Sequence, residues 1–292
     1  MAGFFSLQKG GIAIYSFDKR LNNNTVSAHD SEGKEVILKG KGIAFLNNGA
    51  IDESKIEKVF VFSDKKNLHS YFSLLDKIPY EYVETAELII SYSQKMLHKD
   101  LDEHIYVTIT DHLHYAIQRL KENIAIKNPL IWEIQRFYPT EYQIGLASLD
   151  IVEEKLGVHF DPDEAASIAL HIIDAELNVN LDQTMKMTQA MQDILNIIKY
   201  YFKITFDEES LEYNRLTTHL KYFVQRAMKS EYVQDTDSEL YELIKKKYPG
   251  VHNCTNRIAS YMESQLHYQV TDSEKMYLTV HIQSLLNKYL NP

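Results

Sequence analysis

One segment of the chain occurs twice, at a separation of about 110 residues. Residues 110–119 match residues 217–226 at six of ten positions, with an offset of 107. Two more pairs of segments match in the same order, both at an offset of 110: 138–139 with 248–249, and 161–172 with 271–282. Ordered matches at a nearly constant offset indicate a tandem duplication. The chain is therefore expected to contain two copies of one structural unit.

The repeated region has the apolar spacing of helices. Apolar residues recur every three or four positions, which places them on one helical face. Three such faces are Val83, Ala86, Ile90 and Leu97; Ile105, Ile109, His112 and Ala116; and Ile194, Ile197, Ile198 and Tyr201. The pattern is interrupted at 178–182. We therefore predict two tandem homologous all-α helical-bundle domains, at 69–181 and 182–292.

The first 68 residues have a different pattern. Short apolar runs predict four strands, at 25–28, 35–38, 42–46 and 58–62, and polar residues predict turns at 22–24, 30–33 and 47–49. The sequence thus predicts a small antiparallel β-sheet domain at 16–68, and a multidomain protein. Four short strands bury little core, so such a unit usually needs a partner, often a second copy of itself.

Composition restricts the class of protein. Residues 1–68 carry a net charge of +2 and the rest of the chain carries −12, which suggests different partners for the two parts. A single cysteine, Cys254, excludes a disulfide framework and a cysteine-based zinc site. No apolar run approaches the roughly 20 residues that span a bilayer, and residues 1–11 lack the order of a secretory signal. We expect a cytoplasmic protein without membrane insertion.

Each copy of the repeat keeps two histidines in register. They are His112 and His171 in the first copy, and His219 and His281 in the second. All four lie on apolar stripes, so one interpretation is packing in a core, although retention of both in each copy is less expected for packing. A metal site is a second interpretation, but the sequence has no HExxH or CxxC motif. We therefore expect no metal and no cofactor.

Two acids also recur, Glu164 and Glu274, each seven residues before a paired histidine. Asp161 and Thr271 precede them by three residues, which is the spacing of a helix capping box. Pro162 suits the first position of a helix. These acids are therefore interpreted as helix starts rather than as metal ligands.

A third interpretation of the histidines is phosphorylation, because imidazole is nucleophilic near neutral pH. Arg119 and Arg226 follow His112 and His219 by seven residues, on the same helical face. A phosphoryl group binds favourably to arginine, although these arginines could equally pair with local carboxylates. The sequence has no nucleotide-binding motif. Another protein would therefore donate the phosphate, and we do not expect an enzyme.

Two segments of the predicted β-sheet domain at 16–68 have the composition of an RNA-binding surface. Residues 19–24 and 39–45 combine basic side chains, amides, glycines and an aromatic ring. Lysine suits phosphates, asparagine reads base edges, and an aromatic ring stacks on an unpaired base. The candidate RNA-binding residues are Lys19, Asn22, Asn24, Gly40, Lys41 and Phe45.

Several motifs together resemble one bacterial family. They are Asn-Asn-Asn at 22–24, Gly-Lys-Gly-Ile-Ala-Phe at 40–45, Thr-Asp-His at 110–112, Ile-Ala-Leu-His-Ile at 168–172, Thr-Thr-His-Leu-Lys at 217–221 and Leu-Thr-Val-His-Ile at 278–282. Over residues 16–292 the chain resembles the transcriptional antiterminators of the BglG/LicT/SacY type, especially the β-glucoside-responsive members. These join a co-antiterminator RNA-binding domain to two phosphotransferase-system (PTS) regulation domains. Residues 1–15 have no counterpart and are expected to form an extension.

The resemblance implies a mechanism. A homodimer of the first domain binds an imperfect RNA hairpin, the overlapping terminator cannot form, and transcription continues into sugar-uptake genes. The residues that match RNA-contacting positions are Lys19, Asn24, Gly40, Lys41 and Phe45, with Lys41 where many members have arginine. The four paired histidines match the phosphorylation sites. The resemblance implies HPr as the phosphoryl donor to the second regulation domain and the sugar permease (EIIB) as the donor to the first.

Two other classes of protein are considered. One is a PTS-regulated DNA-binding activator, which needs a helix-turn-helix where residues 1–68 predict strands. The other is an enzyme, such as a histidine phosphocarrier or a metal hydrolase. Catalytic turnover distinguishes such an enzyme from a regulator that only accepts phosphate.

Overall fold

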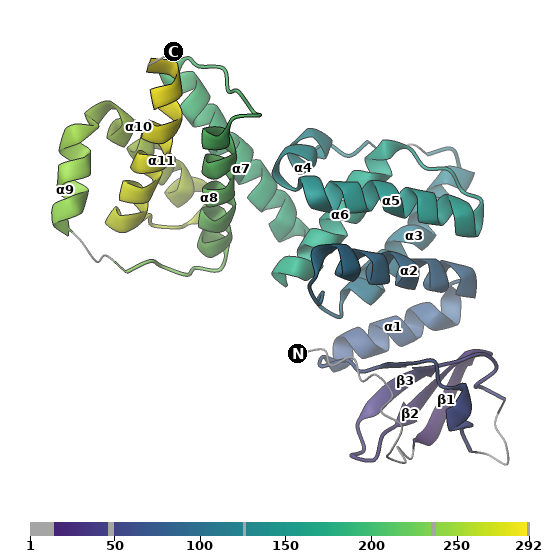
Figure 1. Cartoon of the computed structure of the whole chain (residues 1–292). Coiled ribbons are helices and arrows are strands. Elements are labelled where there is room, and N and C mark those ends of the chain that lie inside the picture. The colour runs from purple at the N-terminus through teal and green to yellow at the C-terminus, as the bar shows by residue number, and fades with distance from the viewer. Residues whose placement is uncertain (1–14, 46–49, 125–126, 235–237, 291–292) are drawn as a thin grey trace. The chain divides into compact units, whose positions relative to one another are not determined.

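The computed structural model describes residues 15–45, 50–124, 127–234 and 238–290 (Figure 1). The chain divides into two compact units. The first contains residues 1–128 and 140–179, and the second contains residues 129–139 and 180–292. Residues 1–14 of the expected extension and the turn predicted at 47–49 lie outside the described residues.

The first unit begins with a four-stranded antiparallel sheet in the order β1-β2-β3-β4. The strands are β1 (Ser16–Asn22), β2 (Thr25–His29), β3 (Glu35–Lys39) and β4 (Lys58–Phe60). Val26 pairs with Leu38, and Ile37 pairs with Phe60. The strands predicted at 25–28, 35–38 and 58–62 are therefore confirmed, with small changes at their ends. Strand β1 was not predicted, because its residues 16–20 are all exposed and show no apolar alternation.

The strand predicted at 42–46 is wrong. Residues 41–44 form turns instead, in which the Ile43 N–H donates to the Gly40 carbonyl at 3.0 Å. Gly42 has a φ of 65°, which lies far from strand geometry. Ile43 and Ala44 are buried against the sheet. A short apolar run therefore marked a buried turn here, which apolar periodicity does not distinguish from a strand.

Five helices follow in the described part of the first unit: α1 (Lys65–Lys77), α2 (Tyr80–Leu97), α3 (Ile105–Lys121), α5 (Pro139–Leu156) and α6 (Pro162–Leu177). Helix α1 begins after Asp64, whose side chain accepts a hydrogen bond from the Lys66 N–H. Pro162 stands in the first turn of α6, as predicted. Helix α6 ends where Asn178 adopts the left-handed conformation. The helical region predicted from residue 69 is confirmed and begins four residues earlier.

The two faces of the sheet pack on different neighbours. On one face, Val26 and Leu38 pack with Ile43 and Ile56 from the connection between β3 and β4. On the other face, Ile37 and Phe60 belong to the core that contains residues of α1, α2 and α3. Figure 1 shows α1 lying against the sheet. The sheet thus completes its second core with the helices that follow it.

Six helices form the described part of the second unit: α4 (Ile131–Phe137), α7 (Leu181–Phe202), α8 (Leu211–Met228), α9 (Ser238–Lys247), α10 (Pro249–Leu266) and α11 (Asp272–Leu290). Helix α7 begins with a capping box formed by Asn180 and Gln183, so the interruption predicted at 178–182 is a break between helices. Helices α8 to α11 follow one another as α3 to α6 do, which is the order that the duplication predicts. None of the described helices combines the length and hydrophobicity that a membrane crossing requires.

Helix α4 comes from the first copy in sequence but packs with helices of the second. Within the second unit it contacts α7 and α8. The Arg136 guanidinium donates to Glu208 at 3.1 Å and to the Gln192 side chain at 3.1 Å. The boundary at 181/182 therefore describes the repeat in sequence, whereas this short helix belongs to the packing of the second copy.

Candidate phosphorylation and RNA-binding sites

The first histidine pair lies between α3 and α6. His112 on α3 and His171 on α6 have ring centroids 5.0 Å apart, with their planes at 57°. Their side chains are 15% and 12% exposed. The duplication placed these residues in register, and the structure brings them into contact.

Glu164 on α6 contacts both predicted residues of α3. Its Oε2 lies 3.0 Å from Nε2 of His112, and its Oε1 accepts a hydrogen bond from Nη2 of Arg119 at 2.9 Å. Burial raises the pKa of the Glu164 carboxyl, but the contact with His112 and the charges of His112 and Arg119 hold that pKa below its ordinary value. Arg119 therefore has a local carboxylate partner, which was one of the two roles considered for it.

His171 is the most strongly perturbed of the paired histidines. Burial, and then the nearby charges of His112 and His104, lower its pKa to about 3. Its Nδ1 lies 3.9 Å from Oδ2 of the buried Asp174. His104 lies at the start of α3 with Nδ1 2.7 Å from an oxygen of Asp102. The ring of His171 is therefore neutral near pH 7.

The second pair lies between α8 and α11 and is more open. His219 and His281 stack with their ring centroids 3.6 Å apart and their planes at 28°. His219 is exposed and His281 is half-buried. Burial, followed by the charges of His219 and Arg215, lowers the pKa of His281.

Glu274 occupies the position equivalent to Glu164 but has different partners. Both of its oxygens accept hydrogen bonds from the Tyr268 hydroxyl, at 3.0 and 3.1 Å, and its side chain is 1% exposed. The Thr271 N–H donates to Glu274 at 3.1 Å, and the Glu274 N–H donates to the Thr271 hydroxyl at 3.3 Å. Arg226 lies 3.5 Å from it. Glu274 contacts neither His219 nor His281 in the described residues.

The capping-box prediction is confirmed in one copy and wrong in the other. Thr271 and Glu274 exchange the reciprocal hydrogen bonds of a capping box. Asp161 makes no capping bond with its side chain. Glu164 is instead turned toward α3, where it meets His112 and Arg119. In the described residues, no three histidine, cysteine or acidic side chains are grouped as metal ligands.

The candidate RNA-binding residues surround the turn at 40–45. Asn24 accepts a hydrogen bond from the Gly40 N–H with its backbone carbonyl at 2.9 Å and one from the Gly42 N–H with its side chain at 2.8 Å. The Asn22 side chain accepts from the Asn24 N–H at 2.8 Å. A Cβ on Gly40 would lie 1.7 Å from the Lys55 carbonyl oxygen. Asn22, Asn24 and Gly40 thus shape the turn.

Three of the candidates remain available at the surface. Lys19 on β1 and Lys41 in the turn have exposed side chains, and Phe45 is 58% exposed. The Arg20 guanidinium lies 5.4 Å from the centre of the Phe45 ring and donates to the Asn23 side chain. Arg20 was not a candidate, although it lies two residues before the asparagine turn at 22–24. This edge of the sheet therefore presents cations and an aromatic ring together.

Comparison with known proteins identifies the domains in which the two candidate sites lie. The CAT RNA binding domain matches residues 15–69, and the PRD domain matches twice, at 87–175 and 192–285. "Transcription antiterminator LicT" of Bacillus subtilis is 42% identical over 92% of this chain and 98% of its own length. "Beta-glucoside operon antiterminator" of Dickeya chrysanthemi is 36% identical over 91% of this chain and 94% of its own length. This chain belongs to the CAT–PRD family of transcription antiterminators.

The family assignment confirms the predicted architecture of a CAT domain followed by two PRDs. A solved structure titled "Crystal structure of GlcT CAT-PRDI" covers 55% of this chain and 97% of its own, with 34% identity and a TM-score of 0.49. The relatives carry the names of regulators. They support the antiterminator rather than the DNA-binding activator or the phosphocarrier.

A buried charged cluster joins the CAT sheet to the first PRD. Lys39 Nζ on β3 lies 3.0 Å from Glu87 Oε2 on α2, and Lys58 Nζ on β4 lies 3.9 Å from the same oxygen. The Tyr71 hydroxyl donates to the other oxygen at 3.4 Å. Burial lowers the pKa of Lys39, but the charge of Glu87 more than offsets it and raises that pKa overall. The sequence signal for this cluster was an acid within the apolar stripe of α2.

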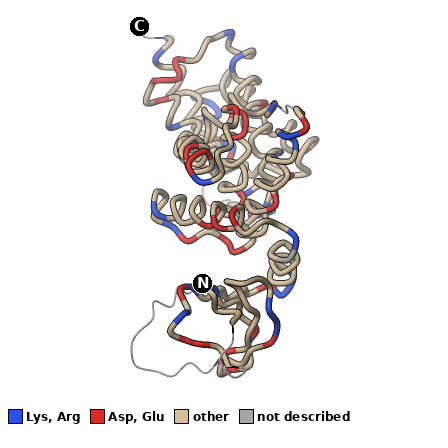
Figure 2. Tube along the Cα trace, turned by 90° about the vertical axis from the view of Figure 1, so that its right-hand side faces the viewer, with Lys and Arg blue, Asp and Glu red and all other residues tan. Residues whose placement is uncertain are grey.

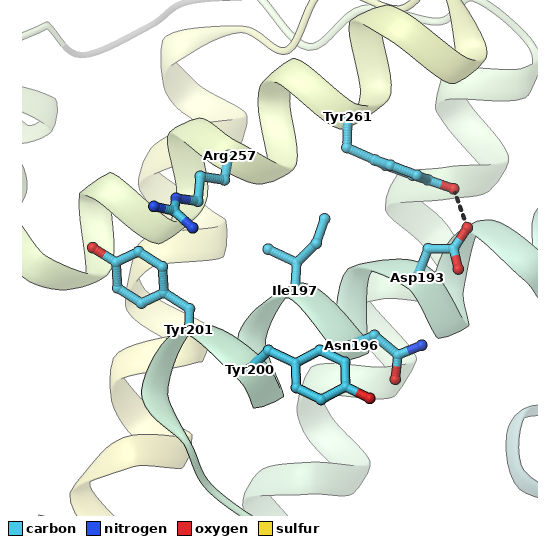
Figure 3. A pocket seen from close by; sticks show the side chains of 7 residues that line it. All are labelled: Asp193, Asn196, Ile197, Tyr200, Tyr201, Arg257 and Tyr261. Carbon is cyan, nitrogen blue, oxygen red and sulfur yellow. Dashed lines mark hydrogen bonds between the residues drawn. The ribbon is translucent and has the colours of Figure 1, made fainter.

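The second PRD also has a hollow that the sequence did not indicate (Figure 3). It has a volume of about 510 Å³ between α7 and α10 and is lined by Asp193, Asn196, Ile197, Tyr200, Tyr201, Arg257 and Tyr261. The Tyr261 hydroxyl donates to Asp193 at 2.7 Å, and the Arg257 guanidinium lies 4.9 Å from the centre of the Tyr201 ring. The first copy has Ala147 and Ile151 at the positions equivalent to Arg257 and Tyr261. The first copy therefore lacks the equivalents of these two polar side chains of the lining.

Proposed function

We propose that this chain controls sugar-utilisation genes, with β-glucoside genes as the expected targets, by binding a hairpin in nascent mRNA. Two copies of the CAT domain, residues 16–68, bind the hairpin, and the terminator that overlaps it then cannot form. The protein acts in the cytoplasm, where the mRNA is made. The observation that carries this proposal is the turn at 40–45, which the Asn24 side chain holds beside an exposed edge strand.

The RNA contacts follow from the exposed groups at this edge. Lys19 and Lys41 neutralise phosphates, and Phe45 stacks on an unpaired base. Asn22, Asn24 and Gly40 hold the backbone in the shape that brings these groups together. Lys and Arg are interspersed with Asp and Glu along the chain (Figure 2). RNA affinity therefore depends on this local arrangement rather than on a uniformly basic surface.

Control by phosphorylation is the second part of the proposal. The acceptors are His112 and His171 in the first PRD (69–181), and His219 and His281 in the second (182–292). HPr and the EIIB domain of a sugar permease are the donors. A phosphoryl group adds a charge of about −1.5 to −2, and Arg119 and Arg226 lie on the same helices as His112 and His219. Rings that pack in pairs must rearrange when one of them acquires this charge.

A gel-shift titration of the full chain tests the RNA part. The probes are a leader hairpin that overlaps a terminator and a scrambled RNA of the same composition, at two salt concentrations. We expect selective binding that weakens with salt, a loss of affinity in Lys19→Ala and in Phe45→Ala, and little change in Lys34→Ala. Lys34 is exposed at the opposite end of the β2–β3 hairpin. Equal binding of both RNAs by the wild type would contradict the proposal.

A further inference from the structure

The two PRDs hold their equivalent glutamates in different ways. In the first PRD, Oε2 of Glu164 lies 3.0 Å from Nε2 of His112. In the second PRD, Glu274 accepts hydrogen bonds from Tyr268 and Thr271 and does not contact the histidine pair. The histidine pairs therefore share their positions in the repeat but not their electrostatic environment.

We propose that Glu164 is a positioning residue that prepares His112 to accept a phosphoryl group on Nδ1, and that the second PRD lacks this device. This inference rests on the proposed phosphorylation of the PRDs. A carboxylate beside Nε2 favours the tautomer that carries its proton on Nε2, which leaves the lone pair on Nδ1. Nε2 of His112 is buried and faces Glu164. The same contact therefore leaves the lone pair on the ring nitrogen that does not face Glu164.

Two sequence differences account for the asymmetry. The residue equivalent to Tyr268 is Val158, which has no hydroxyl to bind the glutamate. The residue equivalent to Thr271 is Asp161, whose carboxylate repels that of Glu164 instead of donating to it. Glu164 therefore lacks both hydroxyl donors that contact Glu274, those of Tyr268 and Thr271, and it turns to His112 and Arg119.

The transfer step balances without an added reactant. The donor is a phosphohistidine of another protein. The lone pair on Nδ1 of His112 attacks its phosphorus, the new P–N bond forms, and the donor P–N bond breaks with its electron pair returning to the donor ring. His112 keeps its proton on Nε2 and becomes an N-phosphoimidazolium. The negative charge of Glu164 stabilises this cation, and the Arg119 guanidinium that Glu164 holds lies on the same helix as the new phosphate.

Phosphorylation by potassium phosphoramidate tests the inference on the full chain, with the rate at each histidine followed by mass spectrometry of peptides. We expect Glu164→Gln to slow modification of His112 by about 10- to 100-fold, the size of effect found when a carboxylate that orients a metal-binding histidine is removed. Glu164→Asp should recover part of the rate. Val158→Tyr, which supplies the missing hydroxyl, should also slow His112. Glu153→Gln is the control, because Glu153 contacts the exposed His159.

The tautomer of His112 gives a second readout, by ¹⁵N NMR of the imidazole nitrogens. We expect the proton on Nε2 in the wild type and a mixed population in Glu164→Gln. Equal rates at His112 in the wild type and Glu164→Gln, with an unchanged tautomer, would overturn the inference. Absence of modification at all four histidines in the wild type would instead contradict the proposed phosphorylation itself.

Discussion

Lys39 on the CAT sheet donates to Glu87 on α2 of the first PRD at 3.0 Å, and both side chains are nearly nine-tenths buried. Lys58 shares the same carboxylate. A buried pair of this kind contributes little net stability compared with apolar packing, but removal of one partner leaves a buried charge uncompensated. The packing of the RNA-binding sheet therefore depends on how α2 of the first PRD is placed.

Replacement of Glu87 should destabilise the first unit strongly. Glu87→Gln leaves the buried Lys39 and the half-buried Lys58 without the charge of Glu87, and we expect a loss of about 3–5 kcal/mol in the free energy of unfolding, measured by urea denaturation. Glu84→Gln is the matched control, because Glu84 lies 3.8 Å from Lys39 but is 51% exposed. Its loss should stay within about 1 kcal/mol. Equal losses in the two variants would show that burial of the pair is unimportant.

Gly40→Ala should disrupt the RNA-binding turn. The added Cβ would lie 1.7 Å from the backbone oxygen of Lys55, which cannot move aside as a flexible side chain could. We expect a stability loss of about 3 kcal/mol and loss of hairpin binding. Gly250→Ala, where the Cβ meets nothing within 4 Å, should leave both unchanged. Wild-type RNA affinity in Gly40→Ala would show that RNA recognition does not depend on the observed shape of the turn.

Acid should destabilise the first PRD through His171. Its pKa is about 3 in the folded chain and near 6.5 when unfolded, so between these values the unfolded state binds the proton preferentially. This stability is complete above pH 6.5 and is lost as the pH falls toward 3. Between pH 7 and pH 5 the residue should account for about 2 kcal/mol. Urea denaturation at both pH values should show a smaller decline in His171→Gln, whereas a variant of the exposed His159 should retain the full decline.

A permanent negative charge at the second histidine pair should promote self-association. His219→Asp and His281→Asp supply part of the negative charge of a phosphoryl group. This charge is attracted to arginines such as Arg215 and Arg226, either in the same chain or in a second chain. We expect tighter dimerisation in sedimentation velocity experiments. His267→Asp, at an exposed position outside the pair, should behave as the wild type. Identical dimerisation constants in all four proteins would rule out this effect.

The sequence predicted the features that depend on local periodicity and on the duplication. Helical spacing located the PRD helices, and the repeat identified His112 and His171 as equivalents of His219 and His281. Strand β1 was missed because an exposed edge strand does not require apolar alternation. The turn at 40–45 resembled a strand because its apolar residues are buried.

The contacts of the two glutamates could not be predicted from spacing. Glu164 and Glu274 share one position in the repeat, and the capping-box pattern fits both. Their partners depend on side chains that packing brings close, Arg119 from α3 in one case and the Tyr268 hydroxyl in the other. The difference between Val158 and Tyr268 is visible in the sequence, but its consequence depends on the tertiary structure.

Read-through transcription in vitro measures antitermination by this chain itself. The template carries a promoter, a leader with the hairpin and overlapping terminator, and a downstream reporter segment, and the purified full chain is added at increasing concentration. We expect full-length transcript to increase with protein, Lys19→Ala and Phe45→Ala to abolish the increase, and a template with a scrambled hairpin not to respond. Termination that stays unchanged at protein concentrations that saturate the hairpin would show that hairpin binding does not prevent terminator formation.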